Sequence, residues 1–356
     1  MNTETANRID NMLYDSGLFP LKSEKLNQLG SFDFSDDIIL VTGAAGTIGS
    51  GLTRLLVNSK YRKLILVDVA ESPLYELIKE LEFEDFNHVD FILLDVTDEK
   101  SLKHLFKTYN PTIIFHAAAY KHVPIMESNP YKAVELNILG TKLLADLANQ
   151  SNVKKFVFIS TDKAVNPIGI MGISKRIGEN YMHFINKNST THFITTRFGN
   201  IFGSNGSIIP LFKRQIEFGK PITITDKSIT RLFISKQKAC NLILKLASKK
   251  NFDYDLYTLN MGFPIKIIDI IERLISFYDI ILKTPEIRII GLRPGEKLYE
   301  DIISENESLV TTNDIDILAI KKLNSFSYKN IDFIELKNIS PNTPHHEIKN
   351  ILSKYI

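Results

Sequence analysis

The chain has 356 residues, 44% of them hydrophobic and 24% charged, which is typical of a globular protein with one large α/β unit and a smaller domain. A formal net charge of +2 gives no indication of nucleic-acid binding, and a single cysteine excludes a disulfide within the chain. No apolar run reaches the ~18–20 residues that span a bilayer, and the N-terminus does not resemble a secretory leader, so we expect a cytoplasmic protein without a membrane span.

The order of apolar and polar stretches predicts the fold. Residues 1–35 are polar and are expected to form an N-terminal extension that packs on the body or on a partner subunit. From residue 37 onward, short apolar runs alternate with stretches long enough for a helix. These runs begin at Ile38, Leu64, Phe91, Ile113, Phe156 and Phe193. The pattern predicts an α/β fold with a Rossmann-like, doubly wound parallel sheet, whose ligands bind at the carboxyl ends of the strands.

The same rhythm suggests the domain boundaries. Residues 36–200 form the predicted Rossmann domain, to which a late strand near 255–262 is added. After Arg197 the alternation loosens. We therefore assign 201–254 and 263–356 mainly to a smaller, discontinuous substrate-binding domain and a C-terminal region.

A glycine-rich turn, residues 43–49, follows the first predicted strand and opens the first predicted helix. Its glycines permit a tight turn and a close approach of the backbone to a pyrophosphate, and the helix N-terminus supplies free N–H groups. The cofactor-binding residues expected in this turn are Gly43, Gly46, Thr47, Ile48 and Gly49. Asp68 ends the second strand, where a carboxylate binds ribose hydroxyls and repels a 2′-phosphate. The expected cofactor is therefore NAD and not NADP.

The ends of the third and fourth strands complete the expected cofactor site. Asp95 and Val96 end the third strand, where the adenine should lie. Ala117 and Ala118 follow the fourth strand and are also expected to contact the cofactor.

Several motifs then occur in an order that identifies a family. They are G-x-x-G-x-x-G at 43–49, His-Ala-Ala-Ala at 116–119, Asn137 with Gly-Thr at 140–141, Ser-Thr-Asp-Lys at 160–163, Met-Gly-Ile-Ser-Lys at 171–175 and Arg-Phe-Gly-Asn at 197–200. In this series the chain resembles the extended short-chain dehydrogenases. Most of these carry Tyr-x-x-x-Lys where this chain has Met171 and Lys175. Met171 cannot transfer a proton, so either the enzyme is silent or another group carries the proton.

The neighbouring residues favour another proton carrier. The run STDKAVNPIGIMGISK at 160–175 resembles the bacterial polysaccharide-biosynthesis subgroup that contains UDP-N-acetylglucosamine 4,6-dehydratases, which have Met at this position. HAAAYKHVPIMESNP from residue 116, RFGNIFGSNGSIIPLF from 197 and GLRPGEKLYEDI from 291 are also similar to that subgroup. The likeness covers roughly residues 37–303.

The resemblance implies roles for individual residues. Thr161 would hydrogen-bond the sugar C4 hydroxyl, Asp162 would protonate the departing C6 oxygen and Lys163 would remove the C5 proton. Lys175 would hold the nicotinamide ribose, and Met171 would shape the pocket. As a base Lys163 must be neutral, a state that desolvation or a neighbouring positive charge favours.

The expected substrate is UDP-N-acetylglucosamine. The residues expected to bind it are Lys121, His122, Asn200, Ser207, Arg231, Arg293 and Glu296. Arginines suit a diphosphate because they form bidentate hydrogen bonds, and no group of residues has zinc-site spacing. We also expect a homo-oligomer. A 5-inverting dehydratase, a UDP-hexose 4-epimerase and a silent NAD- or sugar-nucleotide-binding protein stay open as alternatives.

Overall fold

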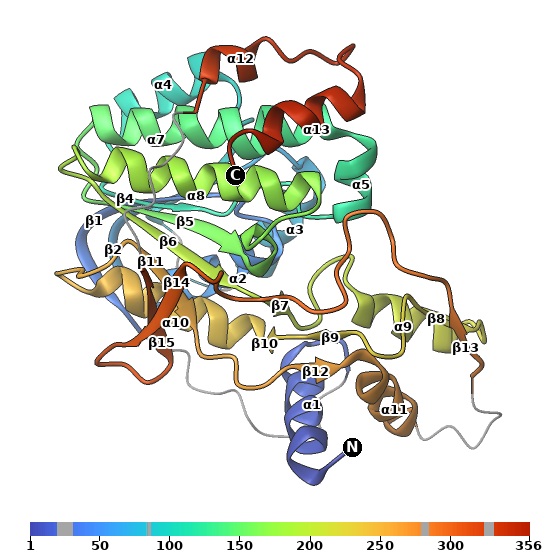
Figure 1. The fold of residues 1–356 in the computed structure, drawn as a ribbon. Coiled ribbons are helices and arrows are strands. Elements are labelled where there is room, and N and C mark those ends of the chain that lie inside the picture. The colour runs from blue at the N-terminus through green and yellow to red at the C-terminus, as the bar shows by residue number, and fades with distance from the viewer. Residues whose placement is uncertain (20–30, 83, 85–86, 279–284, 324–330) are drawn as a thin grey trace.

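The computed structural model describes residues 1–19, 31–82, 84, 87–278, 285–323 and 331–356. A large sheet runs through its centre (Figure 1). Its strands are β1 (Asp33–Thr42), β2 (Lys60–Asp68), β3 (Val89–Leu93), β4 (Ile113–His116), β5 (Lys155–Thr161), β6 (His192–Phe198), β11 (Leu256–Leu259), β14 (Glu307–Thr311) and β15 (Ile317–Lys322). Their order is β14-β15-β11-β6-β5-β4-β1-β2-β3. The strands from β3 to β11 are parallel, and β15 and β14 continue the sheet antiparallel.

Helices cover both faces of this sheet (Figure 1). One face carries α2 (Thr47–Val57), α3 (Glu71–Glu80) and α10 (Lys236–Ser248), and the other carries α4 (Glu99–Tyr109), α7 (Thr141–Gln150) and α8 (Ile170–Asn186). In β1, Val41 points into the first apolar layer and Leu40 into the second. Burial on both faces explains why the strands are continuous apolar runs. The predicted doubly wound Rossmann-like fold is confirmed.

A further helical group packs on the α8 side of the sheet. It consists of α5 (Val123–Ser128), α6 (Pro130–Lys132), the π-helical segment η1 (Ala133–Gly140), α12 (Phe333–Lys337) and α13 (His345–Ser353). These elements share an apolar cluster with the first turns of α8. The C-terminal helices therefore support the helix that carries Met171 and Lys175.

The smaller domain lies below the sheet in Figure 1. It is built from α1 (Thr3–Asp15), α9 (Ile208–Glu217), α11 (Ile267–Phe277) and the short strands β7 (Asn200–Ile201), β8 (Ile222–Ile224), β9 (Thr230–Arg231), β10 (Phe233–Ile234), β12 (Ile265–Lys266) and β13 (Ile287–Ile289). Ile9 and Leu13 of α1 are buried in its apolar core, and Asp10 forms an ion pair with Arg273 of α11. The described part of the N-terminal extension is thus an integral part of this domain.

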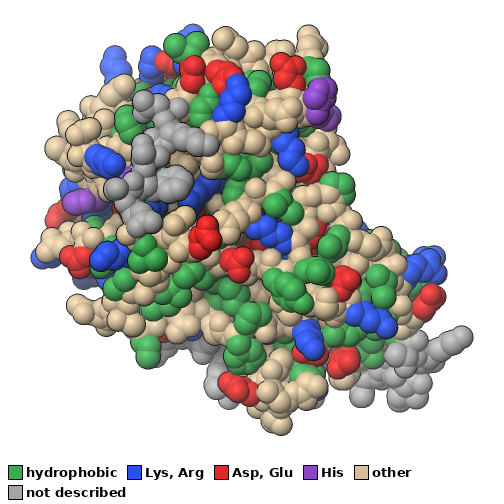
Figure 2. All heavy atoms as spheres, viewed as in Figure 1, with side chains coloured by type: hydrophobic (Ala, Val, Ile, Leu, Met, Phe, Trp, Pro, Cys, Tyr) green, Lys and Arg blue, Asp and Glu red, His purple; other side chains and the backbone are tan. Residues whose placement is uncertain are grey.

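More of the C-terminal half belongs to the large sheet than the sequence indicated. Strands β14 and β15 extend the sheet, and Ile317 and Ala319 pack in the same apolar layer as α2 and α10. Strand β14 begins with Glu307 and has only two apolar residues, and β15 ends in Lys321 and Lys322, so their composition did not suggest a sheet. On the face shown in Figure 2, acidic and basic side chains are interspersed. Within the described ranges, no helix combines the length and apolar character needed to cross a membrane.

Candidate functional site

The turn between β1 and α2 depends on its glycines. Gly43 has a φ of +65°, and a Cβ atom there would lie 2.7 Å from the backbone of Ala118. A Cβ atom on Gly49 would lie 2.0 Å from the carbonyl oxygen of Gly43. Only glycine therefore fits at these two positions, where the turn packs closely against the loop after β4 and against the start of α2. Gly46 precedes α2 and provides no side-chain cap, so the helix presents free N–H groups and the positive end of its dipole.

A cavity of about 340 Å³ lies at this turn. Residues expected to bind the cofactor line it: Gly43, Gly46, Asp68, Asp95, Val96, Ala117 and Ala118. The Asp68 carboxylate accepts hydrogen bonds from the backbone N–H groups of Ala45 and Ala70, each at 2.9 Å. Thr47, Ile48 and Gly49 lie in the first turn of α2 beside it. The structure therefore brings the strand-end residues together in one cleft.

The smaller domain also contributes to this cleft, which the sequence did not indicate. Asn205 lines the cavity, and its backbone N–H donates to the Thr47 hydroxyl at 3.3 Å. It lies in the loop before α9. No spacing or motif within that loop points to the glycine-rich turn, because the contact depends on how the two domains pack.

Two buried polar residues fix the loop after β4. The imidazole of His116 lies between the hydroxyls of Thr42 (2.8 Å) and Thr141 (2.9 Å), and burial lowers its pKa to about 3. Asn137, in the π-helical segment, accepts a hydrogen bond from the backbone N–H of Tyr120 and donates one to the carbonyl oxygen of the same residue. It also donates a hydrogen bond to the hydroxyl of Ser174 in α8. Such π-helical segments often occur at functional sites. Here the segment joins the β4 loop to the helix that carries Lys175.

The end of β5 carries the expected catalytic groups. The hydroxyl of Thr161 donates to Oδ1 of Asp162 at 2.9 Å, and Nζ of Lys163 donates to the same oxygen at 2.9 Å. Asp162 is fully buried, and no described residue hydrogen-bonds its second oxygen, Oδ2. The side chain of Lys163 is 23% exposed, whereas that of Asp162 is fully buried. An acid and a base thus share one strand end.

Residues from distant segments surround Lys163. Its Nζ donates to Oδ1 of Asn200 at 3.0 Å and lies 3.8 Å from Oε1 of Glu300. Arg231 lies 3.9 Å from that same Glu300 oxygen. The sequence analysis did not single out Glu300, although it lies in the GLRPGEKLYEDI motif. Only the resemblance could have pointed to it, because nothing in the spacing relates it to Lys163.

Helix α8 carries the remaining pair. Met171 is buried in the apolar cluster under the C-terminal helices. Lys175 follows one turn later, with Nζ 4.1 Å from the centre of the Phe158 ring. Burial lowers the pKa of Lys175 to about 7, although Glu179 acts in the opposite direction. The amine can therefore exchange a proton near neutral pH.

A buried ionic cluster holds these elements in register. The guanidinium of Arg197 in β6 contacts Glu179 of α8 at 2.7 Å and Glu307 of β14 at 2.8 Å. Glu179 also accepts from Ser160, which directly precedes Thr161. Burial opposes ionisation of Glu307, but Arg197 outweighs it and lowers the pKa to about 2. The cluster joins β5, β6, α8 and the segment after Glu300.

Three of the residues expected to bind substrate, Lys121, His122 and Ser207, lie in the loop after β4 and in the loop before α9. His122 packs against Gly206, where a Cβ atom would lie 2.6 Å from the imidazole. Burial lowers its pKa, and the charge of Lys121 adds to the effect. Ser207 precedes α9, and its hydroxyl is buried without a hydrogen bond to the part of the chain described. Their contact with a substrate stays a prediction.

The two arginines expected to bind the diphosphate differ from each other in burial: Arg231 is buried and Arg293 is exposed. Arg231 is buried and donates to backbone carbonyl groups of Thr230, Lys297 and Leu298, so it anchors the segment that ends at Glu300. Glu296 accepts a hydrogen bond from the backbone N–H of Arg293, and Arg293 is exposed. Arg293 is thus available to an incoming anion.

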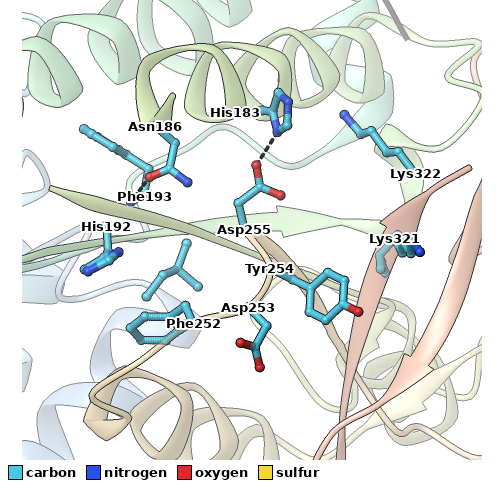
Figure 3. Close-up of a pocket in the computed structure, with 12 residues that line it drawn as sticks. His183, Asn186, His192, Phe193, Phe252, Asp253, Tyr254, Asp255, Lys321 and Lys322 are labelled. Atoms are coloured by element: carbon cyan, nitrogen blue, oxygen red, sulfur yellow. Dashed lines mark hydrogen bonds and ion pairs between the residues drawn. The ribbon is translucent and has the colours of Figure 1, made fainter. Parts of the chain in front are cut away.

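The pocket in Figure 3 lies elsewhere. It is formed at the start of β6 and β11 and at the end of α8, and its dashed line joins His183 to Asp255. Ligands of open parallel sheets bind at the opposite, carboxyl ends of the strands. We therefore place the functional site at the glycine-rich turn and the end of β5.

The chain is similar to known proteins. A protein family described as "Polysaccharide biosynthesis protein" matches residues 39–322. Capsular polysaccharide biosynthesis protein CapD of Staphylococcus aureus is 41% identical over 280 residues, 78% of this chain and 47% of CapD. The chain thus spans about half the length of CapD. A UDP-N-acetylglucosamine 4,6-dehydratase (inverting) of Campylobacter jejuni is 32% identical over 311 residues, 84% of this chain and 87% of that enzyme.

An epimerase and a solved structure are also similar. A UDP-glucose 4-epimerase of Rickettsia rickettsii is 33% identical over 283 residues, 77% of this chain and 80% of that protein. The X-ray structure of Pen from Bacillus thuringiensis superposes with a TM-score of 0.74 at 30% identity, covering 81% of this chain and 88% of Pen. The chain belongs to the polysaccharide biosynthesis protein family, within the extended short-chain dehydrogenase fold.

Proposed function

We propose that this chain is an NAD-dependent nucleotide-sugar 4,6-dehydratase that acts on UDP-N-acetylglucosamine and serves bacterial surface glycan synthesis. The observation that carries the proposal is the contact between Asp162 and Lys163 at the carboxyl end of β5. Oxidation at C4 alone needs no second acid–base pair, whereas loss of the C6 hydroxyl needs both an acid and a base. The similarity to the Campylobacter dehydratase supports the substrate.

The cleft at the glycine-rich turn fits NAD. Gly43 and Gly46 line the cleft, and the uncapped start of α2 beside them suits a pyrophosphate, while the Asp68 carboxylate suits the adenosine ribose. NAD bound there would supply the hydride acceptor for C4 and the hydride donor for C6. The buried amine of Lys175 would hold the nicotinamide ribose.

The residues at the end of β5 would move the protons. Thr161 would hydrogen-bond the C4 hydroxyl and pass its proton to Asp162, which it already contacts. Lys163 would take the C5 proton while Asp162 gives its proton to the departing C6 oxygen, so that water leaves. The proton lost from the C4 hydroxyl thus ends on that water. Lys163 would return its proton to C5 when the hydride reaches C6, so the sum of the steps is loss of one water without net oxidation.

A 4-epimerase is the second candidate, and the Rickettsia relative favours it. Epimerisation also begins with oxidation at C4 but retains the C6 hydroxyl. Asp162 and Lys163 would then have no elimination to catalyse. A 5-inverting dehydratase would use the same residues and differ in the face on which C5 is reprotonated.

A product assay tests the proposal. The purified protein is incubated with a panel of UDP-, GDP- and dTDP-sugars, and the products are analysed by mass spectrometry and NMR. We expect loss of one water from UDP-N-acetylglucosamine and a 4-keto-6-deoxy product. A C4 epimer of unchanged mass would support the epimerase, and binding without turnover would support a silent protein.

The cofactor can be tested separately. Asp68 places a carboxylate where NADP carries its 2′-phosphate, so we expect calorimetric titration of the cofactor-free protein to show clearly tighter binding of NAD. Equal or tighter binding of NADP would contradict this assignment of Asp68.

A further inference from the structure

Glu300 is a buried carboxyl group for which the proposed reaction has no role so far. Its Oε1 lies 3.8 Å from Nζ of Lys163 and 3.9 Å from the guanidinium of Arg231. Its side chain is only 4% exposed, and Oε2 is buried without a hydrogen bond to any residue in the described ranges. A buried oxygen without a partner is uncommon in folded proteins, so its presence beside Lys163 needs an explanation.

One proton of the proposed reaction has no assigned acceptor. A lysine side chain is ordinarily an ammonium at neutral pH, and Nζ of Lys163 donates a hydrogen bond to Oδ1 of Asp162. A base must be neutral, so the ammonium has to give up a proton before the C5–H bond breaks. Asp162 handles a different proton, which it receives through Thr161 and delivers to the C6 oxygen.

We propose that Glu300 receives the proton that Lys163 must lose. An N–H bond of the ammonium breaks, an O–H bond forms on Glu300, and an ion pair becomes a neutral amine and a neutral carboxyl group. The transfer needs no further reactant. Glu300 acts through Lys163 and is therefore a positioning residue for the reaction. This inference rests on the proposed dehydratase function.

The surroundings of Glu300 suit this role. Burial raises its pKa and the carboxylate of Asp162 adds to the rise, whereas Lys163, Arg231 and Lys297 oppose it. Substrate binding removes water, and a drier site favours the neutral pair over the ion pair. The separation of 3.8 Å is long for direct transfer, but contacts between catalytic groups commonly shorten when substrate binds.

The variant Glu300→Gln retains the size of the side chain but cannot accept a proton. We expect kcat to fall about 10²-fold or more at neutral pH. The affinity for NAD should hardly change, because Glu300 does not line the cofactor cleft. Raising the pH should restore part of kcat, since the solvent then removes the proton from Lys163.

Two further variants separate proton transfer from structure. Glu300→Asp retains a carboxyl group and should recover part of the lost kcat. Asp301→Asn makes the same charge change at the next, exposed residue and should leave kcat unchanged. Melting temperatures of all three variants check that they are folded. A turnover of Glu300→Gln equal to that of the parent protein, or a loss that is the same at every pH, would overturn the inference.

Chemical labelling gives a readout without turnover. The amine of Lys163 is accessible, so its acetylation can be followed by peptide mass spectrometry over a pH series. Labelling in Glu300→Gln should begin at lower pH than in the parent, because the ammonium has lost a neighbouring carboxylate. Unchanged labelling would contradict the coupling. If the parent does not dehydrate any substrate, the proposed function fails, while labelling still decides whether Glu300 and Lys163 are coupled.

Discussion

The cofactor cleft and the end of β5 are built in different ways. The cleft is lined mainly by residues at consecutive strand ends, and one of its carboxylates, Asp68, accepts hydrogen bonds from the N–H groups of Ala45 and Ala70. At the end of β5, charged side chains from distant segments meet, and Asp162 and Glu300 each retain a buried oxygen without a hydrogen bond to the described residues. The Asp68 carboxylate in the cleft thus has hydrogen-bond partners within the protein, whereas two carboxyl groups at the end of β5 each keep an oxygen without one among the described residues.

The difference implies that the two regions should respond differently to substitution. A binding surface made of backbone depends on shape, so substitutions there should alter affinity and folding. A reactive group depends on charge and protonation, so substitutions that preserve shape should still abolish turnover. The predictions below test this distinction.

The largest effect is expected at Asp162. Asp162→Asn preserves the shape of the residue but removes the acid, so turnover should fall about 10²- to 10⁴-fold. NAD binding should persist, because Asp162 does not line the cofactor cleft. Steady-state kinetics and calorimetry measure the two quantities. Parent-like turnover of the Asn variant with NAD bound would remove Asp162 from the mechanism.

The ionic cluster of Arg197, Glu179 and Glu307 beside the end of β5 should affect stability. Glu307→Gln removes the carboxylate that pairs with Arg197, and we expect the free energy of unfolding at pH 7 to fall by about 3 kcal/mol. The pKa of Glu307 is lowered to about 2, so its contribution is present above pH 4.5 and is lost as the pH falls toward 2. Urea unfolding over this range should show the parent and variant converging.

Glu305→Gln is the matched control for that measurement. It makes the same change at an exposed residue of the same segment and should alter the unfolding free energy by less than about 0.5 kcal/mol. If both variants lowered the free energy of unfolding equally at every pH, the ionic cluster would not be the source of the stability lost in Glu307→Gln.

In the cofactor cleft, we expect the shape of the backbone to determine the affinity for NAD. Gly43→Ala places a methyl group 2.7 Å from the backbone of Ala118, so NAD affinity should fall at least about tenfold. Gly219→Ala is the control, because Gly219 has a similar φ of +60° but open space around its Cβ position. Calorimetric titration should find that Gly219→Ala binds NAD with the affinity of the parent protein. An equal loss of NAD affinity in both variants would mean that backbone strain alone causes the loss.

The smallest effect on turnover is expected at Met171. Met171→Ala should lose about 2–5 kcal/mol of stability, because the side chain is buried among α8 and the C-terminal helices. A thioether transfers no proton, so turnover by the folded variant should stay measurable. Complete loss of activity in a folded, NAD-binding variant would assign Met171 a role beyond packing.

The sequence predicted the large sheet well, because both of its faces are buried and its strands are continuous apolar runs. It also predicted the cofactor turn, since Gly43 and Gly49 occupy positions where a Cβ atom cannot fit. It did not indicate β14 and β15, which are short and partly charged. Glu300 and Asn205 were missed because they reach the site only when distant segments pack together.

The central claim is that the hydride removed from C4 returns to C6 of the same sugar while water leaves. UDP-N-acetylglucosamine deuterated at C4 is converted in ordinary water, and the position of the label is determined by NMR. We expect a 4-keto-6-deoxy product with the deuterium at C6. A product whose label is lost to solvent, or a C4 epimer that retains the label at C4, would contradict the claim.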